Sequence, residues 1–181
     1  CYVNEARFTG ARRVENLIKF TNTLTNAAWV ANGTATVAAI STNAALVGPD
    51  GVVCYEITGN GTSNSLYHQL TLNGAGTGTG VLRAVPHTFS VYLRAGTVST
   101  AVISLYVSGG AVAATATVTL NSTWQRFAIT GTPDGTSTYR VLIAPGSSGT
   151  INAKQAQLED MAGETLDASS NVPPSEYVSR D

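Results

Sequence analysis

Three tyrosines and one arginine are the residues of this chain that could best bind a ligand. Tyr67, Tyr92 and Tyr106 each alternate with the apolar residues of a strand-like segment, and Arg94 shares the face of Tyr92. Aromatic rings stack on the C–H faces of sugars, and polar neighbours fix the sugar hydroxyls. If these strands lie in one sheet, the four residues form a face that predicts glycan binding. The alternatives are that this face packs on a neighbouring subunit, or that the tyrosines are scattered singly over the surface.

Catalytic groups are not recognisable in the sequence. His68 and His87 lack metal-ligand spacing, and no Gly-x-Ser-x-Gly motif joins a strand to a helix. A glycosidase needs two carboxylates facing each other across a cleft, and the acidic residues here are few and lie mostly in turns. The members of a Ser-His-Asp triad are not neighbours in sequence, so residue spacing neither identifies nor excludes such a triad. We therefore predict a non-enzymatic protein without catalytic residues.

Cofactor binding is expected to be absent, with structural calcium left open. Asp50, Glu15 and the pair Glu159-Asp160 supply oxygen ligands, but no EF-hand-type loop occurs. The glycine-rich segment 73–80 lacks the Lys-Ser/Thr pair and the following helix of a phosphate-binding loop. That segment therefore predicts a hairpin loop, and the identity of any metal is unknown at this point.

The composition favours one extracellular-type β domain. Of 181 residues, 43% are hydrophobic and only 12% are charged, and the formal net charge is −1. Thr, Ser, Asn, Gly and Ala replace charged residues on such a surface, while the apolar share is sufficient for a core. Arg12-Arg13 is the one basic doublet, which argues against nucleic-acid binding. No apolar stretch approaches the length of a membrane span, so no membrane association is predicted.

Alternation of apolar and polar residues predicts many short strands. Turn-forming clusters rich in Gly, Pro, Asn and Asp separate these runs, which is typical of a sandwich or barrel. The segment 153–161 could form a helical turn from its residues alone. The predicted strands span 34–40, 52–58, 66–72, 85–95, 101–108, 113–120, 124–130 and 138–144. The residues expected to face inward are Phe89, Val91, Leu93, Ile103, Leu105, Phe127, Ile129 and Leu158.

The two cysteines do not make a disulfide framework. Cys1 and Cys54 are far apart in sequence, and a bridge would demand close Cα geometry. The other interpretation is that Cys54, within Val52-Val53-Cys54-Tyr55, packs as a small apolar residue. The chain opens without an initiator Met or a signal peptide, so we expect an internal fragment or a processed product.

Several short motifs occur in a fixed order along the chain. Together they resemble the carbohydrate-binding-module-like jelly-roll domains of bacteriophage virion proteins such as tail fibres, tail spikes and head-decoration proteins. Each motif is weak alone, but their order is fairly specific for the fold, and their residues concern architecture more than ligand. The motifs are Ala6-Arg7-Phe8, Val14-Glu15-Asn16-Leu17, Asn26-Ala27-Ala28-Trp29, Pro49-Asp50-Gly51, Phe89-Ser90-Val91-Tyr92, Trp124-Gln125-Arg126-Phe127, Ala156-Gln157-Leu158-Glu159 and Glu176-Tyr177-Val178.

This resemblance implies an all-β, two-sheet antiparallel β-sandwich of the jelly-roll type, and it favours a strand over 153–161. We expect a lead-in segment over 1–13 and the jelly roll over 14–181, with a loose connector at 163–174. The implied function is a virion domain that binds host-surface glycan or supports the receptor-binding part. Two alternatives stay open: a capsid head-decoration protein, and the carbohydrate-binding module of a secreted polysaccharide-active enzyme. The expected partners are glycan or other virion subunits, in a homo-oligomer with a trimer favoured.

Overall fold

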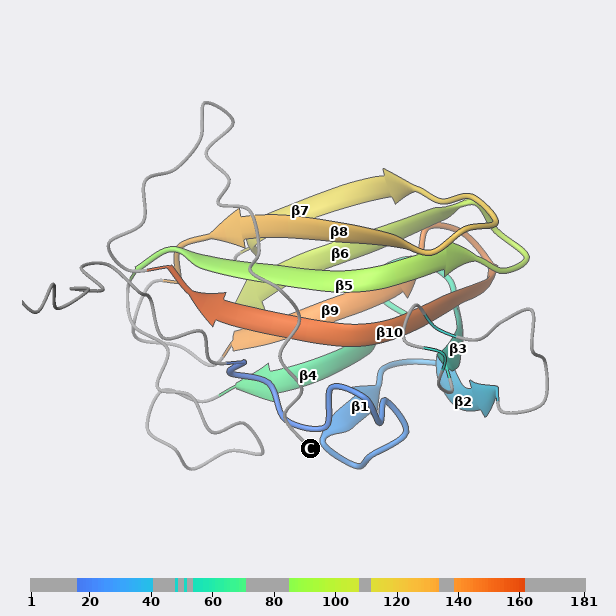
Figure 1. Ribbon diagram of the computed structural model, residues 1–181, viewed down its shortest axis with the longest axis horizontal. Coiled ribbons are helices and arrows are strands. Elements are labelled where there is room, and N and C mark those ends of the chain that lie inside the picture. Colours follow the sequence, from blue (N-terminus) through green and yellow to red (C-terminus); the bar gives the residue numbers. More distant parts are fainter. Residues whose placement is uncertain are drawn as a thin grey trace, which may run out of the picture.

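The computed structural model describes residues 16–40, 48, 51, 54–70, 85–107, 112–133 and 139–161. Ten strands in these ranges form two five-stranded antiparallel sheets, which lie one behind the other as two layers (Figure 1). No residue in these ranges is helical, so the described part of the chain holds no helix that could cross a membrane. The predicted all-β, two-sheet sandwich is confirmed.

Sheet A has the strand order β1-β4-β9-β6-β7. Every neighbouring pair in it is antiparallel. Strand β9 occupies the centre, in line with its mostly apolar sequence, and β1 was not predicted because it is short and lies at an edge. The strands are β1 (Trp29–Ala31), β4 (Leu66–Leu70), β6 (Thr100–Val107), β7 (Val112–Thr119) and β9 (Tyr139–Pro145).

Sheet B has the strand order β2-β3-β10-β5-β8, also antiparallel throughout. The segment 153–161 is therefore mostly strand, because it falls within β10. The strands are β2 (Thr36–Ile40), β3 (Cys54–Gly59), β5 (His87–Ala95), β8 (Gln125–Gly131) and β10 (Gly149–Asp160).

The core lies between the sheets and includes the residues whose alternation predicted it, together with residues before the first predicted strand such as Leu17, Ile18 and Leu24. All eight of the expected inward residues contact it, because the side chains of a strand point alternately to its two faces. Phe127 is only partly buried against the core, while the other seven are at most 6% exposed. Those seven are Phe89, Val91, Leu93, Ile103, Leu105, Ile129 and Leu158.

Strand β10 carries a β-bulge that divides it in two. Its pairing with β5 shifts register between Lys154 and Gln157, and Gln155 within the bulge has a φ of 54°. A left-handed residue is how the chain inserts an extra position while keeping both halves of the strand aligned with the sheet. Ala153 and Leu158 therefore both face the core on either side of the bulge.

Parts of the predicted organisation lie outside the described residues. These are the lead-in segment 1–13, the glycine-rich segment 73–80 and the connector 163–174. The domain limits of 14–181 stay a prediction. At the predicted turn 48–51, the amide of Gly51 donates to the carbonyl of Gly48 at 3.0 Å, and Gly51 has a φ of 78°.

Candidate functional site

The outer face of sheet A brings polar and aromatic side chains from three neighbouring strands together. Tyr67 of β4 pairs with Leu142 of β9, and Leu142 pairs with Ser104 of β6. Two residues further along each strand, on the same face, Arg140 of β9 pairs with Tyr106 of β6. These residues alternate with the core residues of the same strands, so they all point away from the core.

Arg140 lies diagonally across from Tyr67 and covers its ring. The guanidinium carbon is 4.3 Å from the ring centroid, well within the range of a cation–π contact. Arg140 and both tyrosines are each half-buried. The contact fixes the planar guanidinium on one face of Tyr67, so that face of the ring is not open to a sugar. Tyr106, the cross-strand partner of Arg140, is therefore the better platform for stacking.

A hollow of about 440 Å³ lies over this part of the sheet. Its volume falls within the range of small-ligand pockets. Most of its described lining residues carry a hydroxyl or side-chain amide, while apolar atoms form the larger part of the exposed lining. A mixed surface of this kind suits a sugar, which has both hydroxyls and apolar C–H faces. The described lining residues are Asn32, Thr62, Ser63, Ser65, Tyr67, Ser104, Tyr106, Val112, Thr115, Arg140 and Leu142. We call this hollow the sheet A pocket.

One wall of the sheet A pocket is built by two loops that hydrogen-bond to each other. Asn32, which follows β1, donates from its side-chain amide to the Ser63 carbonyl at 3.1 Å, and its backbone amide donates to the Ser65 carbonyl at 2.8 Å. The side-chain oxygen of Asn64 accepts from the Thr34 amide at 2.8 Å. On the floor, the hydroxyls of Ser104 and Thr115 are 2.8 Å apart and share a hydrogen bond. These bonds hold the polar lining in a fixed arrangement.

The structure brings together two of the four predicted site residues. Tyr67 and Tyr106 line the same pocket on sheet A. Tyr92 and Arg94 also point away from the core, but they lie on β5, which belongs to sheet B. The four residues therefore do not form one face. The chain passes from sheet A to sheet B and back as it runs through β4, β5 and β6, and alternation alone does not reveal this crossing. The binding role of each residue stays a prediction.

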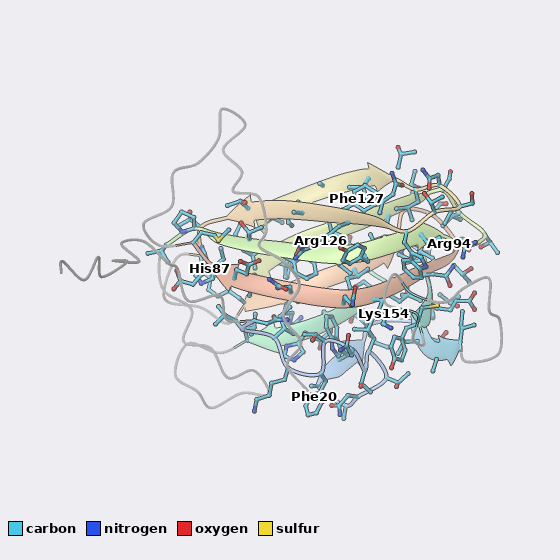
Figure 2. The ribbon with its side chains drawn as sticks, viewed as in Figure 1. Phe20, His87, Arg94, Arg126, Phe127 and Lys154 are labelled. Carbon is cyan, nitrogen blue, oxygen red and sulfur yellow. The ribbon has the colours of Figure 1, made fainter. Side chains whose placement is uncertain are left out.

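The surroundings of Tyr92 differ from those of the sheet A pocket. Its neighbours across the ladders are Lys154 and Arg126, and the Arg126 guanidinium lies 5.7 Å from the centre of the Tyr92 ring. Figure 2 shows Arg94, Arg126 and Lys154 along the layer formed by β5, β8 and β10. Lys154 is only 1% exposed and Ser90, on the same face, is fully buried. Tyr92 and Arg126 are half-buried, as Tyr67, Tyr106 and Arg140 are, so the two faces differ in the neighbours of their tyrosines and not in exposure.

Several residues of the sheet A pocket were not predicted from the sequence. Arg140 lies in the predicted strand 138–144, which is otherwise apolar on both faces, and it was not singled out. A lone arginine in such a strand is itself a signal of a functional residue. Ser104 and Thr115 share the outward parity of Tyr106, and this alternation could have identified them. Asn32 lies beyond the end of a strand that was not predicted, so no sequence pattern pointed to it.

His68 and Cys54 are both buried. His68 has the parity of the buried Leu66 and Leu70 and faces the core, with its ring centroid 5.2 Å from that of Trp29 in an edge-to-face contact. Cys54 is fully buried, and loss of hydration raises the pKa of its thiol. Cys54 forms no disulfide, which agrees with the interpretation that it packs as a small apolar residue and not with a bridge to Cys1.

Structural calcium, which the sequence left open, is not tested by the described residues. No group of three or more His, Cys, Asp or Glu residues suited to a metal occurs among the residues that the structure describes. Glu15 and Asp50 lie outside these ranges, while Glu159 and Asp160 end β10. Glu159 is 1% exposed and accepts a hydrogen bond from the Gln157 amide at 2.6 Å.

Carbohydrate-binding modules are among the solved structures that resemble this chain. The CBM22-1 xylan-binding domain of Paenibacillus barcinonensis Xyn10C matches with a TM-score of 0.58 and 12% identity, over 83% of this chain and 97% of that one. TmCBM61, solved with β-1,4-galactotriose, matches with a TM-score of 0.57 and 14% identity, over 81% and 99%. The chain has the jelly-roll fold of a carbohydrate-binding module. No protein-family model and no curated protein match it.

Two larger proteins contain the same fold as one part of their length. The CBM22-1-GH10 modules of Clostridium thermocellum xylanase 10B, complexed with xylohexaose, match with a TM-score of 0.55 and 15% identity. The enzymatically active domain of bacteriophage CBA120 tailspike protein 4 matches with a TM-score of 0.54 and 11% identity. Each match covers 80% of this chain, but only 28% of the xylanase chain and 21% of the tailspike chain. The chain therefore spans less than a third of either protein, and the likeness concerns the fold.

Proposed function

We propose that this chain is a non-catalytic glycan-binding domain and that the sheet A pocket is its binding site. The observation that carries the proposal is the placement of Tyr106 beside the stacked Arg140–Tyr67 pair, in a hollow of about 440 Å³. Tyr106 supplies a flat apolar surface for a sugar ring, while hydroxyl, amide and guanidinium groups around it can bond to the sugar's hydroxyls.

The fold supports this proposal from a second direction. The solved structures of similar fold include modules described as binding xylan or complexed with galactotriose. Fold alone does not define function, because one sandwich can carry many different sites. The proposal therefore rests on the sheet A pocket, and the likeness in fold adds a precedent for glycan binding by a chain of this architecture.

For the parent protein we propose a bacteriophage tail fibre or tail spike, in which the domain binds host-surface glycan on the virion. The ordered motifs resemble those of phage domains, and the fold is similar to part of a phage tailspike. The module of a secreted polysaccharide-active enzyme is about as well supported, through the xylanase modules. In a phage setting the domain is proposed to work within a homotrimer, since a chain with 12% charged residues has little electrostatic protection against association.

A glycan array followed by calorimetric titration tests the proposed function. We expect the wild-type domain to bind at least one bacterial-surface or plant polysaccharide with modest affinity. The length of the bound polysaccharide should stay unchanged. Binding to no glycan would reject the function and favour a structural role such as capsid decoration. Shortening of the bound polymer would show catalysis and contradict the non-enzymatic part. Light scattering of the intact parent protein tests the trimer, which a purely monomeric species would contradict.

A further inference from the structure

We propose that the sheet A pocket prefers glycans that carry carboxylate groups, such as those built from uronic acids, and that Arg140 is the residue that binds the carboxylate. This inference rests on the proposed function, because it assigns a class of glycan to the same pocket. Arg140 lies on β9, the central strand of sheet A. Its cross-strand neighbours there are Tyr106 of β6 and Gln69 of β4.

The charge of the lining is the first argument. Among the eleven described residues that line the pocket, Arg140 is the one that carries a formal charge, and none is a carboxylate. A neutral sugar needs hydroxyl and amide partners, which Asn32, Ser104 and Thr115 already provide. A guanidinium in the same lining adds an attraction for a negative group on the ligand. Arg140 is half-buried, where such an attraction is stronger than in open water.

The geometry of Arg140 is the second argument. Its guanidinium is held 4.3 Å from the centre of the Tyr67 ring, so the long side chain already has a partner in the ligand-free protein. Ordering of a side chain before binding lowers the entropy lost on binding. A planar guanidinium presents its N–H groups in a fork that matches the two oxygens of a carboxylate. A sugar stacked on Tyr106 would place its substituents next to this fork, because Tyr106 is the direct cross-strand neighbour of Arg140.

Matched pairs of polymers test the preference. The probes are polygalacturonate, alginate, hyaluronate and glucuronoxylan, each compared with the same polymer after its carboxyl groups have been reduced to alcohols. Dextran sulfate, with dextran as its neutral partner, tests whether any polyanion suffices. We expect at least one carboxylated polymer to bind about tenfold more tightly than its reduced form.

Three variants assign the preference to Arg140. We expect Arg140→Gln to abolish the difference in affinity between the carboxylated and the reduced polymer, because the carboxylated form loses its charged partner. Arg140→Lys keeps the charge but loses the fork, so it should retain only part of the difference. Lys19→Gln removes one positive charge that is not among the pocket lining and should change neither affinity. Thermal unfolding of each variant checks that the fold is intact, and the wild-type comparison stands without the variants.

The outcomes separate this inference from the proposed function. Equal binding of the carboxylated and reduced polymers overturns the carboxylate preference and leaves glycan binding in place. Equally tight binding of dextran sulfate also overturns it, because the attraction would then be for negative charge in general. Binding to neither member of any pair, nor to any other glycan, overturns the proposed function together with this inference. A preference that survives Arg140→Gln in a folded variant overturns the assignment to Arg140.

Discussion

Asn16 and Leu158 are joined by a buried hydrogen bond although 142 positions separate them in the chain. The side-chain oxygen of Asn16 accepts from the Leu158 amide at 3.1 Å, and its side-chain amide donates to the Ala156 carbonyl at 3.0 Å. The Leu17 amide adds a backbone bond to the Leu158 carbonyl at 2.8 Å. Asn16 thus satisfies backbone groups beside the bulge of β10, where the ladder to β5 is interrupted.

Replacement of Asn16 by alanine should destabilise the fold strongly. Asn16→Ala removes both bonds to β10 and leaves the buried Leu158 amide and Ala156 carbonyl without this partner. We expect a loss of about 3 kcal/mol in the free energy of unfolding, because unsatisfied buried groups cost more than the bonds themselves contribute. Urea denaturation measures the loss. Asn121→Ala is the control, since Asn121 is exposed and accepts from Thr123 in a turn; a loss as large as that for Asn16→Ala would contradict the argument.

Gly33 should be essential to the wall of the sheet A pocket. Its φ is 63°, and a Cβ there would lie 2.6 Å from the Ser63 carbonyl oxygen. We expect Gly33→Ala to lower the free energy of unfolding by about 2 kcal/mol and to weaken glycan binding, because the two loops must move apart. Gly61→Ala is the matched control: its φ of 65° is equally unfavourable, but a Cβ would meet nothing within 4 Å. If both variants lose the same stability and bind glycan alike, the close packing of the wall is unimportant.

Tyr106 should contribute more to glycan binding than Tyr92. Removal of one stacked aromatic ring costs about 1 kcal/mol, so Tyr106→Ala should weaken binding roughly fivefold to tenfold. The Tyr106 ring points away from the core, so the free energy of unfolding should change little. Tyr92→Ala, made on the outer face of sheet B, should leave the affinity unchanged. Titration of a bound glycan into both variants checks this, and the reverse ranking would move the binding site to sheet B.

Cys54 should resist thiol reagents until the protein unfolds. Its side chain is fully buried, and desolvation is the largest cause of the raised pKa of its thiol. In a Cys1→Ser background, we expect Cys54 to be labelled no faster than the domain unfolds. Prompt labelling of the folded domain would contradict this.

The raised pKa of Cys54 also predicts a dependence of stability on pH. Its thiol holds a proton more tightly in the folded state than in the unfolded state. The resulting contribution to stability is present below about pH 9 and is lost as the pH rises further. Urea denaturation between pH 8 and pH 10 should therefore show a shallower decline for Cys54→Ala than for its parent. If the free energy of unfolding declines equally with pH in both proteins, the raised pKa of Cys54 does not contribute to the pH dependence.

The sequence by itself determined which side of several strands faces the core. Alternation along β5, β6 and β8 identified Phe89, Ile103 and Ile129 as inward, and all three are buried. The same alternation identified Tyr67 and Tyr106 as outward. This information is local, because successive side chains of a strand point to opposite faces whatever the strand pairs with. Turn residues between the runs added the approximate limits of most strands, although β1 was missed.

Only the tertiary structure decided which outward faces coincide. Strand pairing joins segments that are distant in the chain, and its register depends on contacts that no local pattern contains. The pairing of β9 with both β4 and β6 places Arg140 beside Tyr67 and Tyr106. The pairing of β5 with β8 and β10 places Tyr92 in the other sheet. Two tyrosines with the same parity therefore lie on opposite sides of the sandwich, because an outward direction exists on each of its two sheets.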